Sequence, residues 1–64
     1  MPIITVELFK GRTREQKREL VQALTDTYVR VLGGRADAVT ILLSDVAKED
    51  WAVGGELMAD KYPE

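Results

Sequence analysis

The chain has neither cysteine nor histidine among its 64 residues. The absence of cysteine excludes disulfides, thiolate metal sites and a cysteine nucleophile. The absence of histidine removes the most frequent acid–base side chain and the most frequent metal ligand. Ser44 and the five threonines therefore have no imidazole that could activate them for nucleophilic attack. Any acid–base chemistry must use another kind of group.

The net charge of the chain is small, and the chain has no long apolar run. Nine basic and eleven acidic residues give a net charge of −2, which is too balanced to favour nucleic-acid binding. No apolar run approaches the ~20 residues of a membrane span. The N-terminus lacks the charged region and apolar stretch of a signal peptide. We therefore expect a cytoplasmic protein that binds neither nucleic acid nor a membrane.

The length of the chain limits how it can be stabilised. We expect a single domain over residues 1–64. A domain of this size buries only about 60% of the surface that its unfolded chain exposes, so it usually needs a cross-link or a partner. Because no cysteine can supply a cross-link, we expect the chain to form an oligomer.

Three segments have the patterns of regular secondary structure. Ile3–Phe9 is rich in β-branched and apolar residues and predicts a strand. Thr13–Gln16 has the residues of a capping box and predicts a helix that runs to about Leu32, where Gly33–Gly34 ends it. Ala38–Ser44 predicts a second strand. The helix should bury an apolar stripe formed by Leu20, Val21, Leu24, Thr27, Tyr28, Val31 and Leu32.

Strand, helix and strand in this order form a β-α-β unit of the α/β (α+β) class, in which the two strands run parallel. Two strands alone leave both edges of the sheet open, and a single helix can cover only one face. The simplest solution is a dimer in which two copies pair into a four-stranded sheet about a two-fold axis. After the second strand, Gly54–Gly55 predicts a C-terminal hairpin or loop. Along the second strand one face should carry Val39, Ile41 and Leu43.

Two residues are candidates for chemistry. Pro2 follows Met1, which is generally removed before a small residue such as proline, and its removal would leave a free secondary amine. In an apolar pocket the charged form of that amine is destabilised, its pKa falls, and it can act as a base near neutrality. Arg12 follows the first strand, and a guanidinium is suited to binding a carboxylate. The alternatives are that Pro2 only begins a strand and that Arg12 is a solvent-exposed loop residue.

The two candidates lie at opposite ends of the first predicted strand. At ~3.3 Å per residue, Pro2 and Arg12 are on the order of 25–30 Å apart within one chain. They can share a site only if Arg12 comes from another subunit. The predicted function therefore depends on the predicted oligomer.

Several short motifs follow one another along the chain. They are Pro2-Ile3, Gly11-Arg12, Glu15-Gln16-Lys17, the second strand, Ala47-Lys48, Trp51 and Gly54-Gly55-Glu56-Leu57. In order and spacing, this set resembles the 4-oxalocrotonate tautomerase family of the tautomerase superfamily, over nearly the whole chain. The resemblance implies β-α-β subunits paired into four-stranded sheets, usually assembled as a hexameric trimer of dimers. It also implies a cofactor-free site in which the N-terminal proline moves a proton between carbon and oxygen of an enol or dienol acid.

The resemblance assigns roles to four residues. It implies that Pro2 is the general base and that Arg12 binds a substrate carboxylate from a neighbouring subunit. Trp51 falls where the family usually has a phenylalanine that walls the pocket and helps to keep the pKa of the amine low. Thr40 stands where the family has a second arginine, and the loss of a hydrogen bond of roughly 1.5–3 kcal/mol to a charged group could cost about one or two orders of magnitude in rate. Arg35 is the nearest replacement, about 16 Å from Thr40 along an extended chain.

We therefore expect a cofactor-independent tautomerase, an isomerase acting on the enol of a 2-oxo acid or a related small carboxylate. Thr40 leaves open a substrate other than a dicarboxylate. Two alternatives remain. One is a hydratase or dehalogenase of small unsaturated acids, in which Pro2 acts as an acid and Glu7 or Glu56 activates water. The other is a non-catalytic partner subunit of a hetero-oligomer, which would contribute Arg12 to a site whose proline comes from the other chain.

Overall fold

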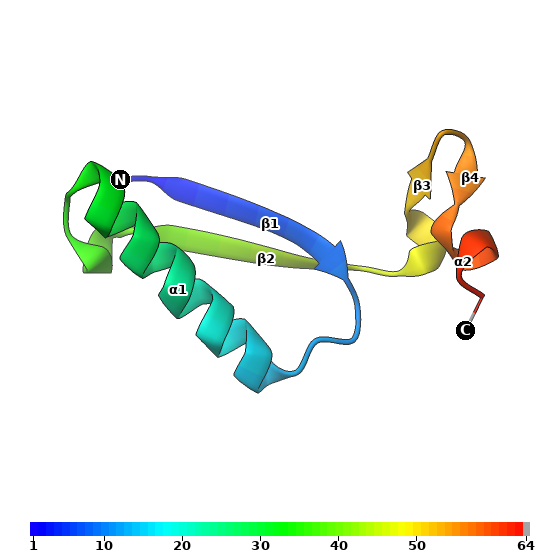
Figure 1. Cartoon of the computed structure of the whole chain (residues 1–64), viewed down its shortest axis with the longest axis horizontal. Coiled ribbons are helices and arrows are strands. Elements are labelled where there is room, and N and C mark those ends of the chain that lie inside the picture. Colours follow the sequence, from blue (N-terminus) through cyan, green and yellow to red (C-terminus); the bar gives the residue numbers. More distant parts are fainter. Residues whose placement is uncertain (64) are drawn as a thin grey trace.

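Two strands and a long helix are followed by a small hairpin and a short helix in the computed structural model, which describes residues 1–63 (Figure 1). This order confirms the predicted β-α-β unit. No helix in the described part of the chain is both long and apolar enough to cross a membrane. In chain order the elements are β1 (Ile3–Phe9), α1 (Arg14–Leu32), the 3-10 turn η1 (Ala36–Ala38), β2 (Thr40–Val46), the 3-10 turn η2 (Lys48–Asp50), β3 (Ala52–Val53), β4 (Glu56–Leu57) and α2 (Met58–Lys61).

β1 and β2 pair in parallel over their whole lengths, from Ile3 opposite Thr40 to Phe9 opposite Val46. β1 has the predicted bounds, whereas β2 lies two residues later than the predicted Ala38–Ser44. The strand begins later because the 3-10 turn η1 occupies the residues before it. It ends later because the register continues its pairing to the last residue of β1.

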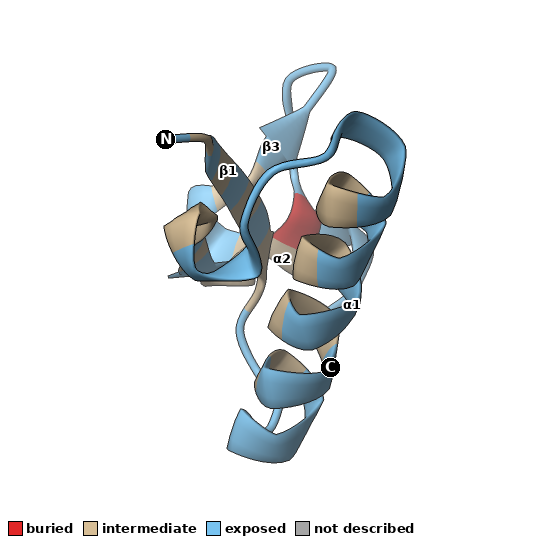
Figure 2. Ribbon diagram, turned by 90° about the vertical axis from the view of Figure 1, so that its left-hand side faces the viewer, coloured by how far each residue is buried: buried red, intermediate tan, exposed pale blue. Residues whose placement is uncertain are grey.

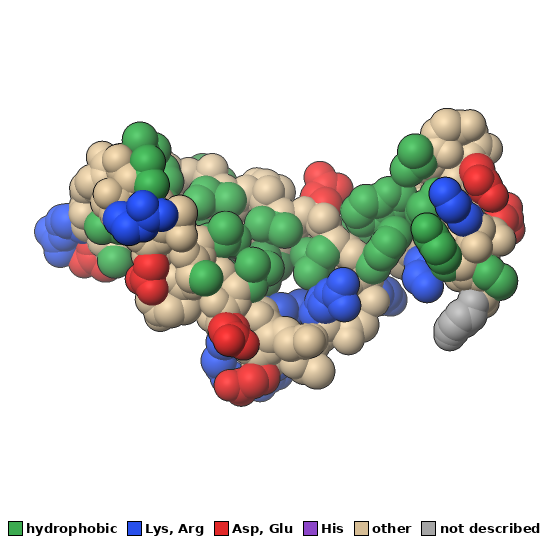
Figure 3. Space-filling view, in the orientation of Figure 1, with side chains coloured by type: hydrophobic (Ala, Val, Ile, Leu, Met, Phe, Trp, Pro, Cys, Tyr) green, Lys and Arg blue, Asp and Glu red, His purple; other side chains and the backbone are tan. Residues whose placement is uncertain are grey.

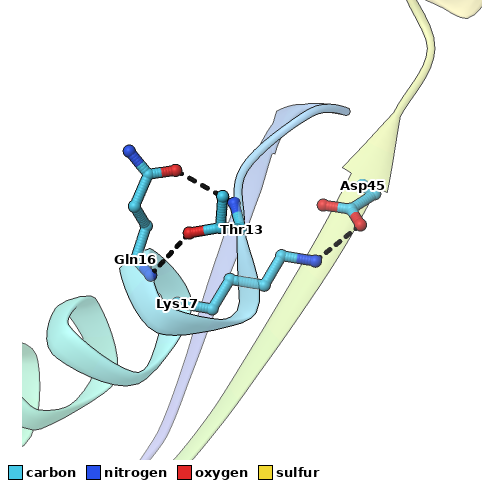
Figure 4. Close-up of polar contacts among 4 residues, drawn as sticks. All are labelled: Thr13, Gln16, Lys17 and Asp45. Carbon is cyan, nitrogen blue, oxygen red and sulfur yellow. Dashed lines mark hydrogen bonds and ion pairs between the residues drawn. The ribbon is translucent and has the colours of Figure 1, made fainter.

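Both ends of α1 have the structure that the sequence predicts. At its start, the Thr13 hydroxyl accepts a hydrogen bond from the Gln16 backbone N–H at 3.0 Å. The Gln16 side-chain oxygen accepts one from the Thr13 backbone N–H at 2.9 Å, which completes the capping box (Figure 4). At its end, Gly33 has a φ of 83° and donates its N–H to the Val29 carbonyl at 2.9 Å. A residue with a Cβ would be strained in this conformation.

α1 runs obliquely to the strands (Figure 1), and its half-buried residues lie on the side towards β1 (Figure 2). Because of this oblique crossing, the line of contact moves around the helix along its length. In the last turn Val29 is half-buried, whereas Val31 and Leu32 are 61% and 69% exposed. The predicted stripe is wrong at Thr27, Val31 and Leu32. The half-buried residues of α1 are Lys17, Leu20, Val21, Leu24, Thr25, Tyr28 and Val29.

The two faces of the sheet differ in exposure. The face towards the helix carries half-buried apolar residues, namely Ile4, Val6 and Leu8 of β1 with Ile41 and Leu43 of β2. The predicted face of Val39, Ile41 and Leu43 is confirmed, since all three are half-buried. On the opposite face Ile3 is 65% exposed and Leu42 is 53% exposed. This second face has no cover in the described part of the chain.

The C-terminal segment extends away from the β-α-β unit (Figure 1). β3 and β4 pair antiparallel, with Val53 opposite Glu56, and Gly54 and Gly55 have φ values of 62° and 87°. These positive φ values are those that a two-residue hairpin turn requires, so the predicted hairpin is confirmed. The sequence did not predict α2, because four residues are too few to show a helical period.

The chain is more open than a compact protein of its length. Its accessible surface is 5041 Å², whereas roughly 4,100 Å² is expected for a compact monomer. Its radius of gyration is 14.8 Å, against about 11 Å for a compact domain of this length. Among residues 1–63, Met58 alone is buried (Figure 2). Much of the apolar surface is therefore available to other chains.

Candidate active site

Pro2 and Thr40 lie side by side where the two parallel strands begin. The Thr40 backbone N–H donates to the Pro2 carbonyl at 3.0 Å, which continues the pairing of β1 and β2 by one step. Both residues are half-buried. Because this bond uses only backbone atoms, it does not engage the Thr40 hydroxyl.

Met1 determines whether Pro2 can act as a base. In the full chain the Pro2 nitrogen is part of a tertiary amide, which has no basic lone pair. Met1 is 94% exposed, so the bond that joins it to Pro2 is not protected by packing of the Met1 side chain. Its removal would place a secondary amine at the edge of the sheet, next to Thr40.

Arg12 lies in the turn between β1 and α1, next to Gly11, whose φ is 118°. The side chain is exposed, and Arg12 lines a hollow of about 70 Å³ together with Leu8, Gln16, Lys17 and Leu20. Lys17 carries the second positive charge of this hollow, but its Nζ binds Asp45 Oδ2 at 2.6 Å. Among the cations at the hollow, Arg12 is therefore the one available to an anion.

Trp51 packs against Phe9, the last residue of β1. Their ring centroids are 4.3 Å apart, and the rings are tilted by 51°. Such offset, tilted pairs are favourable beyond the area that they bury. The contact fixes the start of the C-terminal segment against the end of the sheet. Phe9 had no role in the predicted site, because its partner depends on the path of the loop after β2.

Within one chain the four predicted residues form two groups at opposite ends of the sheet. Pro2 and Thr40 lie where the strands begin, whereas Arg12 and Trp51 follow the strand ends. The seven residues of β1 span roughly 20 Å. One chain does not bring the two groups together. Apolar side chains gather over the sheet region and on the C-terminal segment of the face shown in Figure 3, where other chains could cover them.

The other charged candidates do not complete either group. Arg35 pairs with Asp37 at 2.7 Å, and its side chain is 82% exposed. Glu7 lies in β1 opposite Ser44 and is exposed, about 16 Å along the strand from Pro2. Glu56 is exposed in the C-terminal hairpin, at the other end of the molecule from the start of β1 (Figure 1). No single chain therefore places either carboxylate beside Pro2.

A family model described as "Tautomerase enzyme" matches residues 2–61, so the matched region begins at Pro2. The chain belongs to the tautomerase family. This tautomerase chain is 33% identical over 60 residues to a 2-hydroxymuconate tautomerase of Bacillus subtilis, an alignment that covers 94% of the chain and 97% of that relative. Family membership confirms the predicted resemblance and supports an isomerase activity of the tautomerase type.

Solved tautomerase structures agree with this fold. A 4-oxalocrotonate tautomerase isozyme from Methylibium petroleiphilum is 42% identical, with a TM-score of 0.93 and coverage of 97% of each chain. A heterohexamer 4-oxalocrotonate tautomerase from Chloroflexus aurantiacus is 30% identical, with a TM-score of 0.88 and coverage of 94% of this chain and 97% of that one. The β-α-β arrangement with a C-terminal hairpin is thus the fold of this family.

Proposed function

We propose that the chain is a cofactor-independent tautomerase that interconverts the enol and keto forms, or the dienol isomers, of a 2-oxo acid. Pro2, freed by removal of Met1, is the general base. The observation that carries this proposal is the position of Pro2 at the start of the family match, half-buried and joined to Thr40 by the 3.0 Å backbone hydrogen bond. A base held by the sheet has a defined position relative to a substrate bound at the sheet end.

The proposed reaction moves one proton in two steps. The Pro2 amine takes the proton from the enol hydroxyl as the O–H electron pair forms the carbonyl and the carbon–carbon double bond shifts. The protonated amine then donates its proton to the carbon that has gained electron density. The substrate keeps its composition, and the amine returns to its starting state, so the step requires neither oxidant nor reductant.

The remaining residues of the proposed site bind and enclose the substrate. Arg12 of a neighbouring copy holds the carboxylate through two parallel hydrogen bonds. Thr40 offers a hydroxyl that can donate to or accept from a substrate oxygen, but it adds no charge. Trp51 supplies an apolar wall with an indole N–H at its edge. A substrate with one carboxylate and a neutral oxygen group fits this set better than a dicarboxylate.

The proposed site requires an assembly of at least two copies, and we propose a homohexamer built as a trimer of dimers. The distance along β1 between the Pro2 and Arg12 groups supports an assembly of at least two copies. The excess of accessible surface, the uncovered sheet face and the exposed apolar residues of the C-terminal segment, Val53, Leu57 and Tyr62, support it as well. Pairing of two sheets into four strands would cover edges that a two-stranded sheet leaves open.

A hetero-oligomer is the second candidate, because one structural neighbour at 30% identity is a heterohexamer. In that case this chain would need a second kind of chain to complete its sites. The native mass of the chain purified alone separates the two proposals. A stable homo-oligomer with activity supports the enzyme, whereas an inactive chain that assembles only with another gene product supports the partner subunit.

The catalytic proposal is tested by measuring ketonisation of phenylenolpyruvate and of 2-hydroxymuconate together with intact mass. Pro2→Ala should lower kcat/KM by about 100-fold or more, since general-base catalysis contributes about that factor. Alanine also permits removal of Met1, so both proteins can be compared with free N-termini. Specific activity should rise in proportion to the fraction of chains that lack Met1. Full activity in Pro2→Ala would contradict the proposal.

A further inference from the structure

The turn that carries Arg12 has little apolar packing of its own. From Lys10 to Glu19 every residue is exposed except Lys17, which is half-buried. Hydrogen bonds fix the two ends of the turn. The Lys10 N–H donates to the Val46 carbonyl at 3.0 Å, and the capping box closes the start of α1. Between these ends, the start of the helix needs another contact to hold it against the sheet.

Lys17 supplies that contact through Asp45 (Figure 4). Its Nζ lies 2.6 Å from Asp45 Oδ2, and the bond joins α1 to β2 across 28 residues of sequence. The two side chains are 29% and 35% exposed. Charge-assisted hydrogen bonds of this length are among the stronger polar contacts, and partial shielding from water reduces their screening.

The other ion pairs in residues 1–63 differ from this one in both reach and shielding. Arg18 pairs with Glu15 within one helical turn, with side chains 65% and 83% exposed. Arg35 pairs with Asp37 two residues away, with side chains 82% and 67% exposed. Exposed local pairs of this kind contribute little to structure. Of the ion pairs in the described residues, only that of Lys17 and Asp45 connects two elements.

Arg12 and Lys17 line the same hollow of about 70 Å³, so one member of this pair lies at the hollow that Arg12 lines. Asp45 holds the Lys17 ammonium and offsets its charge. Without Asp45, the free ammonium would repel Arg12 and compete with it for a substrate carboxylate. Without Lys17, the start of α1 would lose its ion pair with β2.

We propose that Lys17 and Asp45 are positioning residues for Arg12, which keep the turn after β1 in the place from which Arg12 reaches the site of a neighbouring copy. This inference rests on the proposed function, because it assigns a role in that reaction. It predicts an effect on carboxylate binding rather than on proton transfer, since neither residue lies at the Pro2 end of the sheet.

The test compares Lys17→Met and Asp45→Asn with the exchanged pair Lys17→Asp/Asp45→Lys, using phenylenolpyruvate as substrate and native mass as a check on assembly. Each single variant should raise KM about tenfold and change kcat by less than about threefold, the pattern of lost substrate binding. The exchanged pair should return KM to within about threefold of the wild type. Glu15→Gln, which breaks the exposed pair on the same helix, is the matched control and should leave KM unchanged.

A double-mutant cycle with Arg12→Ala ties the effect to Arg12. In the Arg12→Ala background, Lys17→Met should change kcat/KM by less than about twofold, because the group that it positions is absent. An equal loss in both backgrounds would overturn the inference, as would an unchanged KM in both single variants. Failure of both single variants to assemble, with assembly restored in the exchanged pair, would assign the ion pair to oligomer formation and would also overturn it.

The proposed function and this inference fail in different ways. Full activity of Pro2→Ala contradicts the proposed function, whatever the variants of the ion pair do. Loss of activity in Pro2→Ala, with an unchanged KM in Lys17→Met and Asp45→Asn, retains the proposed function and rejects only the positioning role.

Discussion

Mixing two inactive variants should restore activity if each site takes Pro2 from one chain and Arg12 from another. In one chain the two residues lie at opposite ends of β1 and on the order of 25–30 Å apart, which is too far for one small substrate to contact both. Consider an oligomer assembled at random from equal amounts of Pro2→Ala and Arg12→Ala chains. A site is intact when its Pro2 comes from an Arg12→Ala chain and its Arg12 comes from a Pro2→Ala chain. About one site in four meets this condition.

The expected result is therefore ketonisation activity near a quarter of the wild-type value, from a Pro2→Ala parent about 100-fold or more less active and an Arg12→Ala parent about tenfold to 100-fold less active. The chains are co-assembled from the unfolded state or by coexpression, with a tag on one of them. Native mass then verifies that the oligomers are mixed. Parents assembled separately and combined without exchange provide the background.

A second mixture makes the result decisive. Wild-type chains co-assembled with equal amounts of the doubly substituted Pro2→Ala/Arg12→Ala chain should keep about one intact site in four if the site is shared, but about one in two if each chain builds its own site. A shared site is ruled out if the mixture of single variants stays at the parental level while this second mixture retains half of the wild-type activity.

Two further predictions concern the substrate and the stability of the fold. Thr40→Arg would place a cation beside Pro2 and should raise kcat/KM for the dicarboxylate 2-hydroxymuconate by about tenfold or more. The change for the monocarboxylate phenylenolpyruvate should be smaller. An equal change for both substrates would contradict this prediction. Thr13→Ala removes the cap of α1 and should cost about 1 kcal/mol in urea unfolding at fixed protein concentration, whereas Thr27→Ala, an exposed threonine within the same helix, should stay within about 0.5 kcal/mol of the wild type.

The elements that the sequence predicted correctly are those whose ends carry local chemical signals. β1 is a run of β-branched and apolar residues that ends before Gly11, and α1 is bounded by the capping box at Thr13 and by Gly33. The bounds of β2 were two residues off, because they depend on pairing with β1 rather than on local composition. The stripe on α1 was wrong at its C-terminal end, because periodicity does not specify the angle at which a helix crosses a sheet.

In the candidate site, too, some contacts could be predicted from the sequence and others could not. Parallel pairing of the two predicted strands brings Pro2 to the start of the second strand, but its neighbour there, Thr40, follows from the observed register, which is two residues away from the predicted bounds. The contact of Trp51 with Phe9 and the pair of Lys17 with Asp45 could not be predicted, because each joins elements whose relative position depends on tertiary packing. A lysine in the second turn of a helix is usually a solvated charge. Only its half-buried position beside Asp45 distinguishes it.

Because of the length of β1, the proposed activity requires assembly as well as folding of the chain. Each copy presents its proposed base, Pro2, at one end of a roughly 20 Å strand and its proposed carboxylate-binding residue, Arg12, beyond the other end, so a folded isolated chain would hold two half-sites. The apolar surfaces that remain exposed in one copy, including Leu42 on the open sheet face and Leu32 at the end of α1, are those that association would cover. Burial of these surfaces would therefore stabilise the small chain and complete its sites in the same event. A substitution that weakens this association would remove activity without touching any group that contacts the substrate.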